Sequence, residues 1–353
     1  MMREIWYDVE KWRQDGLGST LATVVSVQGS SLRPAGSKMA ISSQGHISGS
    51  VTGGCVEGAV FEEAQIVRES GVPRLASYGV SDESAWEVGL SCGGSIEVFI
   101  ESMDTPAWHV LYPAIQDCLR HKKSACLATV INGQNIGKKR IIIGINQDYG
   151  DLGTPMINQQ LSSFLNNQQN PADPTIITIH TKEGETRLFI EYLLPPPRLL
   201  VIGAVHIAIP LVSMAKTIGL ETIVIDARSA FATQDRFPHA DQLIIEWPAT
   251  ALEKLELDAA SYIVCLSHDE KLDNPALQVA LKSPAPYIGV LGSRKTHAKR
   301  RQALLEMGVS ESELKRIHAP IGLDLGALTP QEIAVSILAE IIANNHSISL
   351  EPR

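Results

Sequence analysis

The fold is decided by the stretch Pro195-Pro196-Pro197-Arg198-Leu199-Leu200-Val201-Ile202-Gly203-Ala204-Val205-His206. Three consecutive prolines favour an extended segment and cannot continue a helix or a central strand. The apolar run that follows them has the length of a buried strand and ends in a glycine turn. We therefore expect a domain boundary here, with one domain over residues 1–194 and a second over residues 195–353.

Strands and helices alternate through the second half. Strand candidates are Leu199–Ile202, Thr222–Asp226, Gln242–Glu246, Tyr262–Leu266 and Tyr287–Leu291. Helical stretches lie near residues 206–218, 249–255, 273–282 and 294–307, and a last helix begins at the capping box Thr329-Pro330-Gln331-Glu332. This alternation predicts a parallel sheet with helices on both faces, which is a Rossmann-like α/β domain.

The first glycine turn of this half resembles part of a dinucleotide-binding fingerprint. Gly203 and His206 lie between a strand and a helix, and Asp226 ends the next strand, where an acid can bind a ribose hydroxyl. These three residues are candidate cofactor-binding residues, although His206 could instead cap its own helix. Val205 stands where a second glycine normally lets the pyrophosphate approach. We expect the Rossmann-like fold without a requirement for NAD(P), and keep an NAD(P)-dependent oxidoreductase as the alternative function.

A second candidate anion site follows the last predicted strand, at Gly292, Ser293 and Arg294. A glycine turn at a helix start directs backbone N–H groups toward a ligand, and the arginine adds positive charge. The alternative is a solvated basic helix face, because Lys299, Arg300 and Arg301 follow closely.

Two cysteines of the first half stand in glycine-rich stretches, Gly49-Ser50-Val51-Thr52-Gly53-Gly54-Cys55-Val56-Glu57 and Ser91-Cys92-Gly93-Gly94. Glycine permits a positive φ and a close approach of backbone amides, and such amides can stabilise a thiolate. The alternative is two tight turns with small buried thiols. Two such loops favour a binding site, whose candidate residues are Cys55, Cys92, Gly53, Gly54, Glu57, Gly93 and Gly94.

One hairpin before the Cys55 loop, Arg33 and Lys38 could give cationic donors to an anionic ligand, or could be exposed turn residues. The first half reads as an α+β domain and contains a faint repeat. Leu21–Val24 and Leu127–Val130 each follow a helical segment and precede a glycine turn with another strand. This is either a duplicated helix–hairpin unit or chance similarity.

Composition narrows the class of protein. The 353 residues carry a net charge of −9, which argues against nucleic acid as the main partner. No apolar run reaches membrane-spanning length, and the charged N-terminus does not match a signal peptide. The five cysteines contain no C-x-x-C pair, which suits free thiols in a reducing compartment. We therefore expect a cytoplasmic protein that does not bind membranes.

Several motifs in order resemble the xanthine dehydrogenase accessory (XdhC/CoxI) family. In the first half they are Gly29–Met39, Gly49–Glu57 and Ser91–Gly94, and in the second half Gly203–Ala208, Val290–Arg294, Ala319–Gly326 and the helix start at Thr329. Relatives commonly have glycine at the position of Val205. The resemblance covers roughly residues 15–102 and 196–343.

The resemblance implies a maturation factor rather than an enzyme with turnover. Such a factor would bind molybdenum cofactor (molybdopterin), assist its sulfuration and deliver it to a xanthine dehydrogenase-type apoenzyme of purine catabolism. Its partners would be that apoenzyme and a cysteine desulfurase, and it could form a homodimer. Carried over to this chain, Cys55 and Cys92 would be the thiols near the metal or the sulfur, and a soft thiolate suits both. A thiol enzyme with Cys55 as nucleophile is a further alternative.

Overall fold

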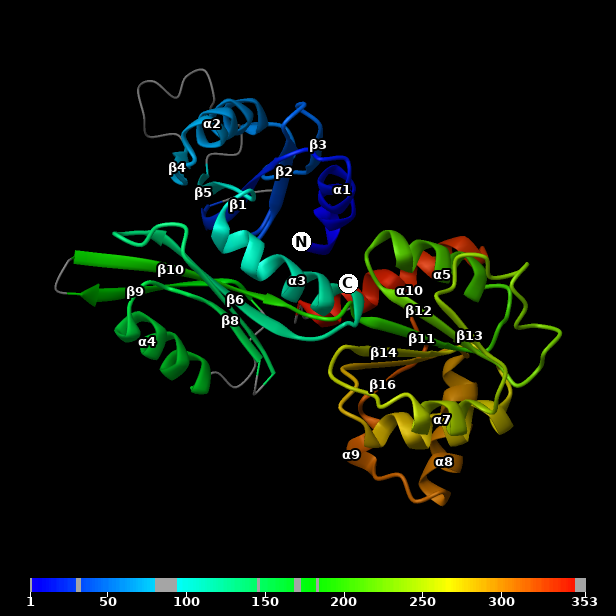
Figure 1. Cartoon of the computed structure of the whole chain (residues 1–353). Helices are drawn as coiled ribbons and strands as arrows, with labels where there is room; N and C mark the ends of the chain where they lie inside the picture. The colour runs from blue at the N-terminus through cyan, green and yellow to red at the C-terminus, as the bar shows by residue number, and fades with distance from the viewer. Residues whose placement is uncertain are drawn as a thin grey trace. The chain divides into compact units, whose positions relative to one another are not determined.

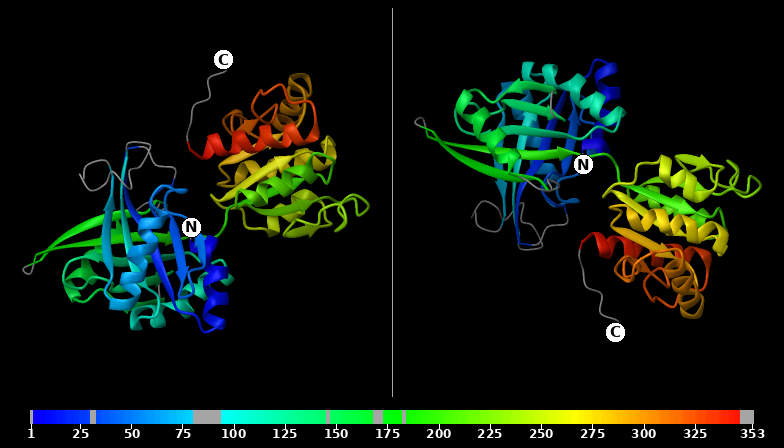
Figure 2. Two further views of the ribbon diagram at one scale, coloured as in Figure 1. Left: turned by 90° about the horizontal axis from the view of Figure 1, so that it is seen from above. Right: turned by 90° about the horizontal axis from the view of Figure 1, so that it is seen from below.

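The computed structural model describes residues 2–29, 33–79, 94–144, 147–167, 173–181 and 184–346. The chain forms two compact units, Met1–Pro195 and Pro196–Arg353. In Figure 1 and Figure 2 the first unit runs in colour from blue to green and the second from green to red.

The first unit contains the same order of elements twice. The first copy consists of α1 (Met2–Gln14), β1 (Ser19–Gln28), β2 (Lys38–Ser42), β3 (Ile47–Gly49), α2 (Glu57–Ser70), β4 (Arg74–Tyr78) and β5 (Ser95–Ser102). The second consists of α3 (Pro106–Arg120), β6 (Ala125–Asn132), β7 (Lys139–Ile143), β8 (Gln147–Asp151), α4 (Pro155–Asn166), β9 (Thr175–Thr181) and β10 (Gly184–Leu193). Their sheets have equivalent strand orders, β3-β2-β1-β5-β4 and β8-β7-β6-β10-β9. The faint repeat of the sequence is therefore a duplication that includes all of these elements.

Each sheet of the first unit is packed on both faces. Helix α2 covers one face of the first sheet, and α4 covers the corresponding face of the second (Figure 1). The helices α1 and α3 share a single apolar core with β1, β2, β6 and β7. The two copies thus bury apolar surface against each other, which stabilises them as one unit.

Charged contacts between the copies are reciprocal. Lys38 Nζ lies 2.9 Å from Glu191 Oε1, and Lys139 Nζ lies 2.7 Å from Glu101 Oε1. The two lysines occupy equivalent positions, because Lys38 pairs with Thr23 in the β1–β2 register and Lys139 pairs with Thr129 in the β6–β7 register. Such reciprocal contacts are the mark of an approximate two-fold axis.

The second unit is a six-stranded parallel sheet in the order β13-β12-β11-β14-β15-β16. Its elements are β11 (Arg198–Ile202), α5 (Ala208–Thr217), β12 (Glu221–Ile225), β13 (Gln242–Ile244), α6 (Pro248–Lys254), β14 (Ser261–Cys265), α7 (Glu270–Lys282), β15 (Tyr287–Val290), α8 (Arg294–Glu306), α9 (Glu311–Leu314), β16 (Ile317–His318) and α10 (Pro330–Asn345).

Alternate residues along these strands face two helix layers. Leu199 and Val201 belong to the core with α5 and α10, whereas Leu200 and Ile202 belong to the core with α6, α7, α8 and α9. The predicted parallel α/β domain is confirmed, and so is the capping box at Thr329. Among the described residues, none of the helices has the length and apolar composition that crossing a bilayer requires.

Candidate functional site

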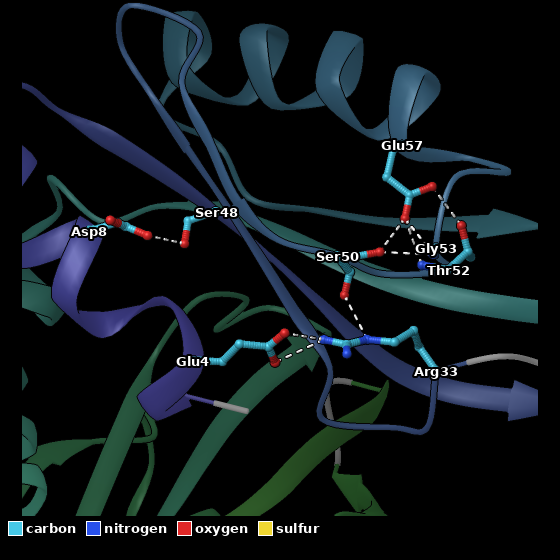
Figure 3. A network of polar contacts seen from close by, with 8 residues as sticks. All are labelled: Glu4, Asp8, Arg33, Ser48, Ser50, Thr52, Gly53 and Glu57. Atoms are coloured by element: carbon cyan, nitrogen blue, oxygen red, sulfur yellow. Dashed lines mark hydrogen bonds and ion pairs between the residues drawn. The ribbon is translucent and has the colours of Figure 1, made fainter. Parts of the chain in front are cut away.

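The Cys55 loop connects β3 to α2 and is built around the carboxylate of Glu57. Glu57 Oε1 accepts hydrogen bonds from Ser50 Oγ at 2.6 Å and from the backbone N–H groups of Thr52 and Gly53 at 2.8 Å each. Its Oε2 accepts from Thr52 Oγ1 at 2.7 Å (Figure 3) and also from the Gly54 N–H at 2.8 Å. Gly53 and Gly54 have φ values of 88° and 129°, which L side chains rarely adopt. The glycines thus let three consecutive N–H groups converge on one carboxylate.

These contacts keep Glu57 ionised. Burial alone would raise the pKa of its carboxyl group, but the hydrogen bonds from Ser50, Thr52 and Gly53 outweigh burial and lower the pKa to about 2. The carboxylate is therefore a fixed negative charge that holds the turn. A general acid or base at neutral pH needs a pKa close to that pH, so Glu57 does not suit this role.

Replacing Glu57 by glutamine should lower the free energy of unfolding by about 1–2 kcal/mol, because an amide has only one acceptor oxygen for the several donors of the loop. The effect stays modest because solvent screens the exposed side of the loop. The folded pKa of about 2 lies below the ordinary value of 4.5, so the charge contributes stability above pH 4.5 that disappears as the pH falls toward 2. Denaturant titrations at several pH values should show that Glu57→Gln lacks this part of the pH dependence. An unchanged pH profile would contradict the role given to Glu57.

Cys55 differs from the other cysteines that the structure describes. Its side chain is half-buried, whereas Cys118, Cys126 and Cys265 are buried. Burial raises the pKa of each of those three thiols, that of Cys126 to about 12. The backbone N–H of Cys55 donates to Thr52 Oγ1 at 3.2 Å, so the residue that contacts Glu57 also fixes the cysteine. Among the described cysteines, Cys55 is the best placed to react or to bind a metal.

The structure brings Arg33 to this loop. Arg33 Nε donates to the Ser50 carbonyl oxygen at 3.3 Å, and its Nη2 pairs with Glu4 at 2.8 Å (Figure 3). The side chain of Lys38 is only 1% exposed and is held in the ion pair with Glu191. Arg33 can therefore contribute charge beside the Cys55 loop, whereas the expectation that Lys38 binds an anionic ligand does not agree with its buried position.

The second cysteine loop lies largely outside the described residues, which include neither Cys92 nor Gly93. Gly94 is described, is buried and immediately precedes β5. Within the described ranges, no group of three or more His, Cys, Asp or Glu side chains could hold a metal ion. Any metal contact of Cys55 and Cys92 thus stays a prediction.

In the second unit, Asp226 is fully buried and makes four hydrogen bonds. Its Oδ2 accepts from the Ala204 N–H and Arg228 Nη2, and its Oδ1 accepts from the N–H and Nε of Arg228, at 2.7–2.9 Å. A carboxylate has about four lone-pair sites, so Asp226 has none left for a ribose hydroxyl. The expectation that Asp226 binds a cofactor therefore does not agree with this geometry.

The glycine turn between β11 and α5 is also closed. Gly203 has a φ of 97°, and a Cβ there would lie 2.7 Å from the backbone of Ser267, so this glycine permits contact with a neighbouring loop. His206 is exposed, and helix α5 has no side-chain cap. The close approach that Gly203 permits is thus used for contact with Ser267, and the position where a pyrophosphate would approach holds the side chain of Val205.

The second predicted anion site has the local structure that was expected. Gly292 has a φ of 149°, Ser293 caps α8 by accepting from the Thr296 N–H at 3.1 Å, and Arg294 is exposed. Arg300, by contrast, is 1% exposed and pairs with buried Asp273, so it does not belong to a solvated basic face.

Sequence reasoning missed the parts of Ser50 and Thr52, whose hydroxyl groups donate to the Glu57 carboxylate. Gly49 of the first copy and Gly150 of the second copy are equivalent, because both make the same close backbone contact. A Cβ at Gly49 would meet the Lys38 carbonyl oxygen, and a Cβ at Gly150 would meet the Lys139 carbonyl oxygen. In the second copy the loop from Gly150 to the start of α4 at Pro155 is shorter and contains neither a cysteine nor a glutamate. Only the loop of the first copy contains a thiol.

Family models match two parts of the chain. A model described as the XdhC and CoxI family matches residues 12–79, and one described as the XdhC Rossmann domain matches residues 199–341. A relative from Bacillus subtilis (strain 168), named as a probable subunit of xanthine dehydrogenase, is 30% identical over 96% of this chain and 96% of its own length. This chain belongs to the XdhC and CoxI family.

Two further relatives agree with this assignment. "Molybdenum cofactor insertion chaperone PaoD" from Escherichia coli (strain K12) is 27% identical over 92% of this chain and 83% of its own length. A crystal structure described as a xanthine dehydrogenase from Bacillus halodurans has a TM-score of 0.77 and 26% identity, over 97% of this chain and 95% of that one. The resemblance inferred from the motifs is thereby confirmed for the family.

Proposed function

We propose that this protein is an insertion chaperone for molybdenum cofactor, which it binds at the Cys55 loop and inserts into a xanthine dehydrogenase-type enzyme. The relatives support this function, because one is named as such a chaperone and matches nearly the whole chain. The observation that carries the proposal is the Glu57-centred turn, which holds a half-buried thiol in a loop that Arg33 contacts through the Ser50 carbonyl oxygen.

The residues of the loop fit the cofactor chemically. The cofactor supplies a thiophilic metal and a terminal phosphate, and a soft cysteine sulfur suits the first. The Arg33 guanidinium suits the second through its positive charge, and a phosphate would compete with Glu4 for it. Glu57 has a structural role instead of a role in binding the cofactor. Its carboxylate accepts hydrogen bonds from the N–H groups of Gly53 and Gly54 and thereby orients Cys55.

We extend the proposal to the finer steps that the family resemblance implies. Cys55, together with Cys92, would assist sulfuration of the cofactor with a cysteine desulfurase as sulfur donor. The protein would act in the cytoplasm and could do so as a homodimer. Residues 1–194 would form the cofactor-binding domain, and residues 195–353 would form a Rossmann-like domain that does not bind NAD(P).

A binding comparison tests the proposal. The full-length protein is incubated with molybdenum cofactor, NADH or NADPH and desalted, and the retained ligand and the melting temperature are measured. We expect molybdopterin to be retained and the melting temperature to rise, because a ligand that binds only the folded state stabilises it. Neither nucleotide should do so. Retention of NADH or NADPH with hydride transfer, and no retention of molybdopterin, would favour the oxidoreductase instead.

A further inference from the structure

A pocket of about 370 Å³ opens in the second unit, at the first turns of α5 and α10. Three segments of the chain form its wall, namely the start of α5, the loop between β12 and β13, and the start of α10. The polar residues of the wall are His206, Ser213, Asp235, Arg236, His239 and Gln331. A pocket of this size can hold a small organic molecule.

Most of these polar side chains are not used by the protein itself. The side chains of His206, His239 and Gln331 make no hydrogen bond or ion pair with any residue that the structure describes, and the same holds for the Ser213 hydroxyl group. All four residues are exposed. Their donor groups are therefore available to a ligand in the pocket.

Arg236 is a cation that the protein positions without an ion pair. Its guanidinium carbon lies 5.5 Å from the ring centroid of Phe231 and 5.6 Å from that of Phe237, and its Nη1 donates to the Phe231 carbonyl oxygen at 2.6 Å. Arg228 and Arg300 of the same unit pair with buried aspartates, whereas Arg236 has no carboxylate partner in the described part of the chain. Its other guanidinium nitrogens thus remain for an anionic ligand.

The charges around the pocket favour an anion. Asp235 is the only acidic side chain of the wall, which also contains Arg236 and two imidazoles. Helices α5 and α10 both begin at the pocket, so the positive ends of two helix dipoles add to the local potential. Histidine and aspartate are also metal ligands, but within the described ranges no group of three such side chains is placed to hold a metal ion.

The distribution of the donors indicates which anion fits. A carboxylate has two oxygens in one plane, whereas the phosphate of a monoester has three acceptor oxygens that point in different directions. His206, Arg236 and Gln331 lie on the three different segments of the wall, and this arrangement suits the phosphate. Ile209 and Pro238 of the same wall give apolar surface to an organic substituent.

We propose that this pocket binds a small organic phosphate monoester. The phosphate accepts hydrogen bonds from Arg236 and from the imidazoles of His206 and His239, and the organic part contacts the apolar residues of the wall. All of these residues belong to the second unit, whereas Cys55 belongs to the first. The pocket is therefore a second binding site, and its ligand is distinct from the cofactor that we place at the Cys55 loop.

Isothermal titration of the full-length protein tests this site with phenyl phosphate as the probe. Benzoate, phenol and inorganic phosphate are the controls, because they replace the phosphate by a carboxylate, remove the charge or remove the organic part. We expect saturable binding of phenyl phosphate, and binding of each control that is at least about tenfold weaker, which corresponds to about 1.4 kcal/mol. Equal binding of any control, or no saturable binding of phenyl phosphate, would overturn the proposal.

Three variants locate the binding. Arg236→Met should weaken binding of phenyl phosphate at least about tenfold, because it removes the guanidinium but keeps a long side chain. The double variant His206→Gln, His239→Gln should also weaken binding, and both positions are exposed, so the fold should tolerate it. Asp235→Asn should tighten binding, since it removes the negative charge nearest in the wall, and a loss of folding cannot produce that result.

His346→Gln is the matched control for these variants. His346 is exposed and follows the last turn of α10, a helix of 16 residues and thus about 24 Å long, whereas Gln331 of the pocket lies in the first turn. This control should bind phenyl phosphate normally. Wild-type binding by Arg236→Met and by the double histidine variant would refute the site. Retention of molybdopterin should stay unchanged in all variants, and its loss would contradict a second, distinct ligand.

Discussion

Replacing Cys55 by alanine is expected to reduce the molybdopterin that the protein retains by at least about tenfold, the equivalent of losing one good contact. The physical reason is that Cys55 is the half-buried thiol of a turn whose shape Glu57 fixes through five hydrogen bonds. Removing the sulfur leaves those bonds in place, so the melting temperature should change little. Activation of a xanthine dehydrogenase-type apoenzyme should fall together with retention.

Cys118→Ala is the control for this measurement. Cys118 lies in the same unit but is fully buried in the core with α1 and α3. Its replacement should lower stability slightly by leaving a small cavity, and should leave retention unchanged. Normal retention and apoenzyme activation by Cys55→Ala would refute the role of the thiol, because the variant leaves the rest of the loop intact.

Replacing Lys38 by methionine is expected to lower the free energy of unfolding by about 3–5 kcal/mol. Lys38 is 1% exposed, and its Nζ binds Glu191 at 2.9 Å and Thr23 Oγ1 at 3.1 Å. Methionine has a similar length but no charge, so the variant leaves the Glu191 carboxylate buried without its cation. A buried charge without a partner destabilises far more than the intact pair stabilises.

Urea titration measures this effect, with Arg74→Met as the control. Arg74 also forms an ion pair, with Glu63 at 2.6 Å, but its side chain is 48% exposed, so its loss should change stability by about 0–1 kcal/mol. The double variant Lys38→Met, Glu191→Leu should recover most of the lost stability, because it removes both charges. If Lys38→Met cost no more than Arg74→Met, the ion pair would not be buried in solution.

Much of the fold could be predicted from the sequence because its signals are local. The run Leu199–Ile202 between prolines and glycine indicates a buried strand by composition alone, and Thr329–Glu332 indicates a helix start by side-chain chemistry. The duplication was only faintly visible, since Leu21–Val24 and Leu127–Val130 preserve the apolar pattern but little else. Apolar residues can be exchanged within a core while the backbone stays the same, so the topology persists after the sequence similarity fades.

The site could be predicted less completely, for reasons of long-range geometry. Cys55, Gly53, Gly54 and Glu57 were visible because they are neighbours in the sequence. Lys38 was expected at the surface, since nothing local reveals that Glu191, far along the chain, pairs with it. Asp226 was a candidate for a ribose contact because of its position after a strand, and the motif does not reveal that Arg228 and Ala204 donate to its oxygens.

The reciprocal ion pairs of the first unit have an evolutionary consequence. Lys38 of the first copy pairs with Glu191 of the second, and Lys139 of the second copy pairs with Glu101 of the first. Residues across the interface of a symmetric homodimer pair in the same reciprocal way. The unit thus has the architecture of a symmetric dimer within one polypeptide. Because both copies lie in one polypeptide, their loops need not be identical. The first copy can therefore carry Cys55 in a loop whose counterpart has no cysteine, while the reciprocal ion pairs between the copies are kept.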